Sequence, residues 1–256
     1  MKKTGQYFSF MVTGLLAGAL ATQAQQKPKA PPTIAELKKN LEAIGEGDEE
    51  SLGDLPDETA RRLVTYLKSH ELPDAQAKAL GLEQVAGPND AARLHLYTFG
   101  YASGGTRGTV HVPVLQWQNA AGKRFAYKLN EECEFDEIHK LVSPGRTLYL
   151  LLGKETTNSY TDLSEAYVVE LKGDYLLLNN TAFGKSALLS LGDVAMKFDE
   201  GKQQLYLTAV PNEPPPIAKE IYIANTASLW QWSQRGQRAP KKVALKFTGA
   251  QFVRQQ

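Results

Sequence analysis

The chain has 256 residues, with 29 lysines and arginines, 28 aspartates and glutamates, and a formal net charge of +1 at pH 7. A chain so close to neutral lacks the basic field that binding to DNA or RNA requires, so nucleic acid is not expected as a partner. Its one cysteine, Cys133, excludes a disulfide within the chain, and the chain is long enough to bury a core without such support.

Residues 1–24 have the pattern of a secretory signal peptide. Lys2 and Lys3 precede an apolar run of 13 residues from Phe8 to Leu20, and small residues follow up to Ala24. The run is shorter than the ~20 apolar residues that a helix needs to span a bilayer. We therefore expect cleavage after Ala24 and export to the periplasm or the extracellular space, and we do not expect an integral membrane protein.

A tether and a short helical segment are predicted next. Residues 25–33 are rich in proline and lack apolar periodicity, which is typical of a tether. Two or three short helices are predicted within residues 34–81. The first begins at Thr33 and Glu36, which are spaced as a capping box, and the second begins at Asp54. Because their apolar stripes are narrow, we expect these helices to dock only loosely.

Residues 82–256 are expected to form an antiparallel β-domain, because apolar and polar residues alternate there with a period of two. The fold class is therefore mainly β: an antiparallel meander, built as a sandwich, a barrel or propeller-like units, preceded by the helices. The strand-like segments are 94–99, 109–117, 124–129, 147–152, 165–171, 175–178, 194–198, 205–210, 221–224 and 243–247.

A weak internal repeat runs through this predicted β-domain. The tripeptides 94–96, 148–150 and 205–207 lie 54 and 57 residues apart, and each opens a strand-like unit. Units of about 40–50 residues have the size of a propeller blade, but a closed propeller needs at least ~4 of them. The repeat therefore leaves open whether the meander closes as a propeller or in another way.

His95 and His111 are the candidate metal ligands. They lie on neighbouring predicted strands joined by a glycine-containing loop centred near Ser103, so a hairpin would place them opposite each other. Two imidazoles on one face of a sheet can hold zinc or copper when a third ligand joins them, and residues 133–139 could supply one. The simpler interpretation is a pair of ordinary strand residues, and no cofactor is expected.

Acidic residues crowd around Cys133. If this segment is a strand, Glu132, Glu134 and Asp136 lie on one side of it. Two carboxylates on neighbouring strands could act as acid and base on a glycosidic bond, and the same row could hold calcium. The alternative function is therefore a secreted hydrolase that uses a carboxylate pair or a His-bound metal. A solvated loop is the simpler interpretation of the segment.

Aromatic and loop residues supply the candidate binding site. Trp230 and Trp232 share one face of a predicted strand, where flat rings could stack on sugars, although core packing would use them equally well. Tyr101 and Arg107 lie in the loop 100–108, and loops on a rigid sheet commonly carry recognition. The sequence contains no phosphate-loop, dinucleotide or zinc-protease motif. We therefore expect an exported, non-enzymatic protein that binds a ligand, a glycan or a component of the cell envelope.

Overall fold

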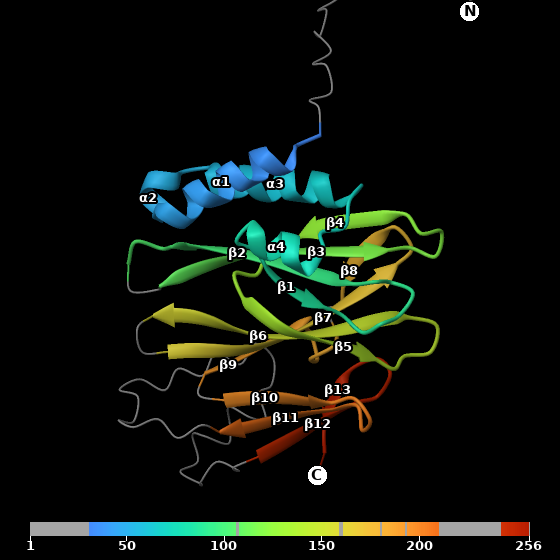
Figure 1. Cartoon of the computed structure of the whole chain (residues 1–256). Helices are drawn as coiled ribbons and strands as arrows, with labels where there is room; N and C mark the ends of the chain where they lie inside the picture. Colours follow the sequence, from blue (N-terminus) through green and yellow to red (C-terminus); the bar gives the residue numbers. More distant parts are fainter. Residues whose placement is uncertain are drawn as a thin grey trace, which may run out of the picture. The chain divides into compact units, whose positions relative to one another are not determined.

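Figure 1 shows the computed structural model of the chain. The predicted signal peptide, most of the tether and the predicted strand 221–224 lie outside the described residues, as do Arg107, Trp230 and Trp232. None of the described helices is long and apolar enough to cross a membrane. The structure describes residues 31–105, 108–158, 161–179, 181–192, 194–209 and 242–255.

Four described helices come first in the chain: α1 (Ile34–Glu46), α2 (Glu49–Leu52), α3 (Leu55–Leu67) and α4 (Asp74–Ala79). The predicted capping box is confirmed, because the Glu36 N–H donates to the Thr33 hydroxyl and the Thr33 N–H donates to the Glu36 carboxylate. The short helix α2 is not among the predicted helices, because its acidic sequence shows no apolar periodicity. A second capping box, formed by Asp48 and Ser51, stabilises its start.

The described strands form three antiparallel sheets, and in each sheet the strands are arranged mainly in chain order. The prediction of a mainly β, antiparallel fold is therefore confirmed. No described sheet closes into a barrel, which is one of the three arrangements that the sequence leaves open. Sheet A contains β1 (Glu83–Ala86), β2 (His95–Ala102), β3 (Thr109–Gln118) and β4 (Arg124–Lys128). Sheet B contains β5 (Glu134–Leu141), β6 (Thr147–Asn158), β7 (Thr161–Lys172), β8 (Tyr175–Leu178) and β9 (Leu188–Gly192). Sheet C contains β10 (Val194–Asp199), β11 (Gln204–Ala209), β12 (Lys242–Phe247) and β13 (Phe252–Arg254).

The helices and sheets are stacked in layers, with the helices on sheet A, sheet A on sheet B, and sheet B on sheet C (Figure 1). Leu37 and Leu63 of the helices share a core with Tyr97 of sheet A, and all three side chains are fully buried. The prediction of loose docking is therefore wrong. The helices pack on one face of sheet A through fully buried side chains, and burial of each such side chain contributes about 1.5–3 kcal/mol.

Sheet B is covered on both faces. Leu151 packs towards sheet A and Leu150 packs towards sheet C, and both are fully buried. This arrangement explains why residues 148–152 are continuously apolar, because a strand that is buried on both faces has no polar side. We call the contact between sheets A and B the A/B interface, and the contact between sheets B and C the B/C interface.

The weak repeat marks equivalent strands but not equivalent orientations. Leu96, Leu150 and Leu207 each lie on the second strand of their sheet. Leu96 packs in the A/B interface, whereas Leu150 and Leu207 both pack in the B/C interface. Sheet C, the last described layer, thus directs its leucines back towards sheet B, so the three units do not repeat by simple translation.

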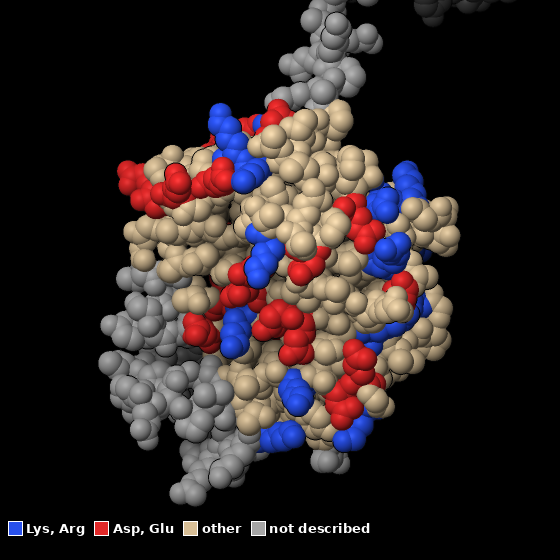
Figure 2. Space-filling model, viewed as in Figure 1, with Lys and Arg blue, Asp and Glu red and all other residues tan. Residues whose placement is uncertain are grey.

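Acidic and basic side chains are mixed on the face seen in Figure 2. One acidic group lies at the level of α2, and further acidic residues lie at the level of sheets A and B, with lysines and arginines between them. This face therefore carries no extended field of a single sign.

Candidate functional site

The β2–β3 hairpin separates the two candidate metal ligands. His95 pairs with Gln116, and His111 pairs with Gly100, so the predicted pairing of the two histidines is wrong. The observed register is displaced by an odd number of residues, and an odd displacement places two side chains on opposite faces of a sheet. Within the described residues, no group of three or more histidine, cysteine, aspartate or glutamate side chains could hold a metal ion.

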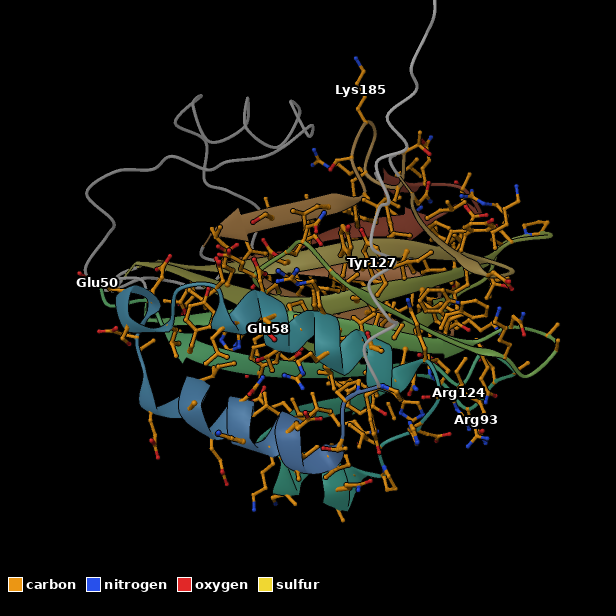
Figure 3. All side chains as sticks on the ribbon, turned by 90° about the horizontal axis from the view of Figure 1, so that it is seen from above. Glu50, Glu58, Arg93, Arg124, Tyr127 and Lys185 are labelled. Carbon is orange, nitrogen blue, oxygen red and sulfur yellow. The ribbon has the colours of Figure 1, made fainter. Side chains whose placement is uncertain are left out.

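His95 belongs to an ionic cluster on the helical side of sheet A. Its Nε2 lies 3.7 Å from Glu71 Oε1, and burial lowers the pKa of the ring. Arg93 and Arg124, which lie close together in Figure 3, contact the same carboxylate at 3.2 and 3.4 Å. Two arginines already neutralise Glu71, so this cluster connects the α3–α4 segment to sheet A without leaving an open ligand position.

His111 faces the opposite way, towards sheet B, with its Nε2 3.8 Å from Glu134 Oε2. Glu83 lies close by, and burial together with the charge of Glu134 raises the pKa of Glu83. The structure thus brings His111 next to one residue of the predicted acidic row. Two carboxyl groups therefore lie beside this imidazole: Glu134, and Glu83 with its raised pKa.

The acidic row itself does not follow the predicted pattern. Residues 134–141 form β5, so the solvated-loop interpretation is wrong for them. A β-bulge between Phe135 and Glu137 interrupts the alternation on which the row depends. Cys133 packs in the A/B interface, whereas His139 contacts Phe198 of sheet C and lies 2.9 Å from Glu200. The structure therefore separates this cysteine from this histidine.

A polar cavity of about 180 Å³ opens at the edge of sheet A, and we call it the edge pocket. It forms because β4 pairs only with the second half of β3, from Val114 to Gln118, so the chain after β4 leaves the sheet beside the first half of β3. Three residues singled out in the sequence, Tyr101, His111 and Glu132, line the pocket. Its other polar residues include Lys128, Asn130 and Glu131.

An ion pair holds one wall of the edge pocket. Lys128 Nζ donates to Asp57 Oδ1 at 2.5 Å, and this hydrogen bond lowers the pKa of Asp57. Asp57 comes from α3 and Lys128 from the end of β4. The ion pair therefore connects the helical layer to the sheet at the mouth of the pocket.

Behind the pocket, the A/B interface ends in a group of polar side chains. We call this group, Glu131, Cys133, Glu155, Glu165 and Ser190, the acidic end. Glu165 of β7 lies between Gly153 of β6 and Ser190 of β9 in the register of sheet B. Only 3% of Glu165 is exposed, and Cys133 is fully buried. Glu131 belongs to both the acidic end and the lining of the edge pocket.

The electrostatics of the acidic end are unusual for a protein interior. Burial, followed by the charges of Glu155 and Glu131, raises the pKa of Glu165 to about 7, although the neighbouring Cys133 thiol opposes the shift. Glu165 Oε2, Glu131 Oε2 and Ser190 Oγ are buried and have no hydrogen-bond partner among the described residues. Burial also raises the pKa of Cys133, so this thiol is not an activated nucleophile. Glu165 is thus a buried carboxyl group whose raised pKa lies near neutral pH.

Glu165 is not among the candidate residues that the sequence indicates. Its one signal is a glutamate within an otherwise largely apolar strand, but half-exposed strands carry such residues routinely. Comparison with protein-family models, curated proteins and solved structures found no match. The edge pocket and the acidic end are therefore the features that indicate a function.

Proposed function

We propose that this chain is an exported, non-enzymatic β-protein that binds a hydroxyl-rich ligand, such as one sugar unit of a glycan, in the edge pocket. The observation that carries the proposal is the chemistry of the pocket wall. Lys128 and Asn130 supply N–H donors, and Glu131 and Glu132 supply carboxylate acceptors. Sugar hydroxyl groups both donate and accept, so a wall that mixes the two roles suits them.

The size and the aromatic residue of the pocket support the same class of ligand. Drug-sized ligands occupy mainly apolar pockets of about 300–1,000 Å³. The edge pocket is smaller, at about 180 Å³, and mostly polar, so it suits one small hydrophilic group. Tyr101 adds an aromatic ring, which can pack against the apolar face of a sugar while its hydroxyl reaches polar groups. The predicted signal peptide agrees with a ligand found outside the cytosol.

Binding of the purified protein to a glycan array, followed by titration calorimetry with the strongest hits, tests the proposal. We expect saturable binding that Asn130→Ala weakens by about tenfold, the effect of losing roughly 1.4 kcal/mol of hydrogen bonding. Lys123→Ala is the matched control, because Lys123 is an exposed lysine paired with Asp174 and does not line the pocket. An array with no saturable ligand, or equal affinity for Asn130→Ala and the natural chain, would overturn the proposal.

The alternative function is a hydrolase, and one observation favours it. Glu83 and Glu134 lie together beside His111, and the raised pKa of Glu83 suits a proton donor next to an ionised partner. Glycosidase activity of the purified protein that disappears in Glu134→Gln while the variant stays folded would replace the binding proposal with this one.

A further inference from the structure

We propose that the acidic end is a pH switch: with Glu165 protonated, sheets A and B stay closed over Cys133, and when Glu165 releases its proton to solvent, this end of the interface loosens. The proposal rests on the packing around Glu165, on the charges that face it, and on its two ionisation states. It concerns only the described residues of sheets A and B.

The packing keeps the Glu165 carboxyl away from bulk solvent. Gly153, which lies between β5 and Glu165 in the register, has no space for a side chain, because an added Cβ would lie 2.8 Å from Cys133 Sγ. Cys133 is fully buried and only 3% of Glu165 is exposed. Bulk water can therefore surround the Glu165 carboxylate only if the strands around it move apart.

The described carboxyl groups that face Glu165 raise its pKa through their negative charge. No lysine or arginine among the described residues is paired with Glu165 or Glu131. Tyr167, next to Glu131, has its pKa raised by burial and by that carboxylate. Among the described residues, the titratable groups that face Glu165 and Cys133 are Glu131 from the segment before β5, Glu155 from β6, Tyr167 from β7 and Asp136 from β5.

These contacts give Glu165 two states with different structural consequences. The protonated carboxyl is neutral and can donate a hydrogen bond to a neighbouring oxygen, so the closed packing suits it. The ionised carboxylate is buried beside Glu131 and Glu155, and no lysine or arginine of the described chain is paired with it. Such a charge is costly unless it is paired or hydrated. Separation of the strand ends around Glu165 would expose the ionised carboxylate to solvent and so lower this cost.

Uptake of a metal ion would be a different way to neutralise this cluster. The described side chains do not favour it, because no three of these ligand types converge at a position that could hold a metal ion. Proton binding needs no such convergence, and the pKa of about 7 places the change of charge within the range that exported proteins meet. Protonation is therefore the response that the geometry supports.

The switch would also affect the edge pocket, because Glu131 belongs both to the acidic end and to the pocket lining. Loosening of the acidic end would move one acceptor in the pocket wall, so ligand affinity would fall as pH rises. This consequence rests on the proposed function, whereas the switch itself does not. The test therefore uses no glycan, and failure of ligand binding would leave its result unaffected.

Reactivity of the Cys133 thiol with dithiodipyridine tests the switch, because Cys133 is the only cysteine of the chain. The measured quantity is protection, the ratio of the reaction rate of urea-unfolded protein to that of native protein at the same pH. This ratio cancels the intrinsic pH dependence of the thiol. We expect protection in the natural chain to fall by about tenfold or more between about pH 5.5 and about pH 8.5.

Three variants make the result specific. Glu165→Gln should keep its protection high at both pH values, and Glu131→Gln should shift the midpoint to lower pH, because it removes one of the charges that hold the proton on Glu165. Glu50→Gln makes the same change on the exposed surface of α2 (Figure 3) and should behave as the natural chain.

Protection that is independent of pH in the natural chain would overturn the switch, as would an equal loss in the natural chain and a folded Glu165→Gln. If Glu165→Gln does not fold, the shift in Glu131→Gln decides the question, and an unchanged midpoint contradicts the proposal. Added calcium or zinc provides the last comparison. Protection at high pH that is restored by either ion would replace the proton with a metal as the controlling ligand.

Discussion

The A/B and B/C interfaces of sheet B differ in how they treat buried polar groups. In the B/C interface, Phe183 and Phe252 stack at 5.0 Å, and the buried Asn179 donates to Ala250 O and accepts from Thr181. In the A/B interface, Glu165 is equally buried but one carboxylate oxygen has no described partner. One sheet therefore has one face that is stabilised by packing and satisfied hydrogen bonds, and another whose stability depends on a proton.

This difference shows that burial alone does not determine what a polar group does in a core. Asn179 cannot change its charge, so its hydrogen bonds fix one structure at every pH. Glu165 can change its charge, and its raised pKa means that the folded chain binds a proton more tightly than the unfolded chain does. Substitutions of single residues in each interface test this contrast.

Leu150→Ala should have the largest effect. Leu150 is fully buried in the B/C interface, and removing such a side chain from a core costs about 2–5 kcal/mol. We expect this loss in the free energy of unfolding, measured with urea, at both about pH 5 and about pH 8. A loss that differs strongly between the two pH values would mean that the B/C interface is not independent of protonation.

Glu165→Gln should remove the pH dependence of the A/B interface. Because the folded-state pKa is raised to about 7, stability from this group is fully present below the unfolded-state pKa and is lost as pH rises towards 7. Between about pH 5 and about pH 8 the natural chain should lose roughly 2–3 kcal/mol that the variant keeps. Parallel pH profiles of unfolding free energy for the two chains would contradict this expectation, and Glu50→Gln controls for net charge.

Gln116→Leu tests a buried polar group whose hydrogen bonds are satisfied. Gln116 Nε2 donates to the carbonyl oxygens of Leu67 and His70, both at 2.6 Å, and its Oε1 accepts from the Tyr97 hydroxyl. Removing the amide leaves these groups unpaired, at a cost of about 1–3 kcal/mol that should not vary with pH. Thermal unfolding at the two pH values measures it, and a neutral or stabilising result would show that this network does not fix the helical layer.

Lys128→Met should have the smallest effect on stability. Lys128 and Asp57 are exposed, at 38% and 66%, and an exposed ion pair contributes about 0–1 kcal/mol, less at high salt. Unfolding in low and high salt measures this contribution. A larger loss that is insensitive to salt would show that Lys128 supports the pocket wall by packing and not by charge.

The sequence predicts the features that depend on neighbouring residues. The capping box of Thr33 and Glu36 involves residues three apart, and both of its hydrogen bonds are present. The run 148–152 predicts a strand from local composition, and burial on both faces is what such a run favours. Such local patterns do not depend on which elements pack together in the folded protein.

The features that the sequence does not predict depend on distant contacts or on turns. The register of His95 and His111 depends on where the hairpin turns, and the observed pairing of Ala102 with Thr109 moves the turn away from Ser103. The strand β5 is hidden because its bulge breaks the alternation. Glu165 resembles any polar strand residue until sheet A is known to cover it.

The most direct test of the switch is a titration of the Glu165 side chain itself. Carboxyl carbon NMR of protein labelled at glutamate reports the protonation state of each glutamate in the folded chain. We expect one resonance, absent from Glu165→Gln, to titrate near pH 7, well above the ordinary glutamate value of about 4.3. If every glutamate of the folded protein titrates near that ordinary value, the A/B interface holds no proton-dependent group and the account is wrong.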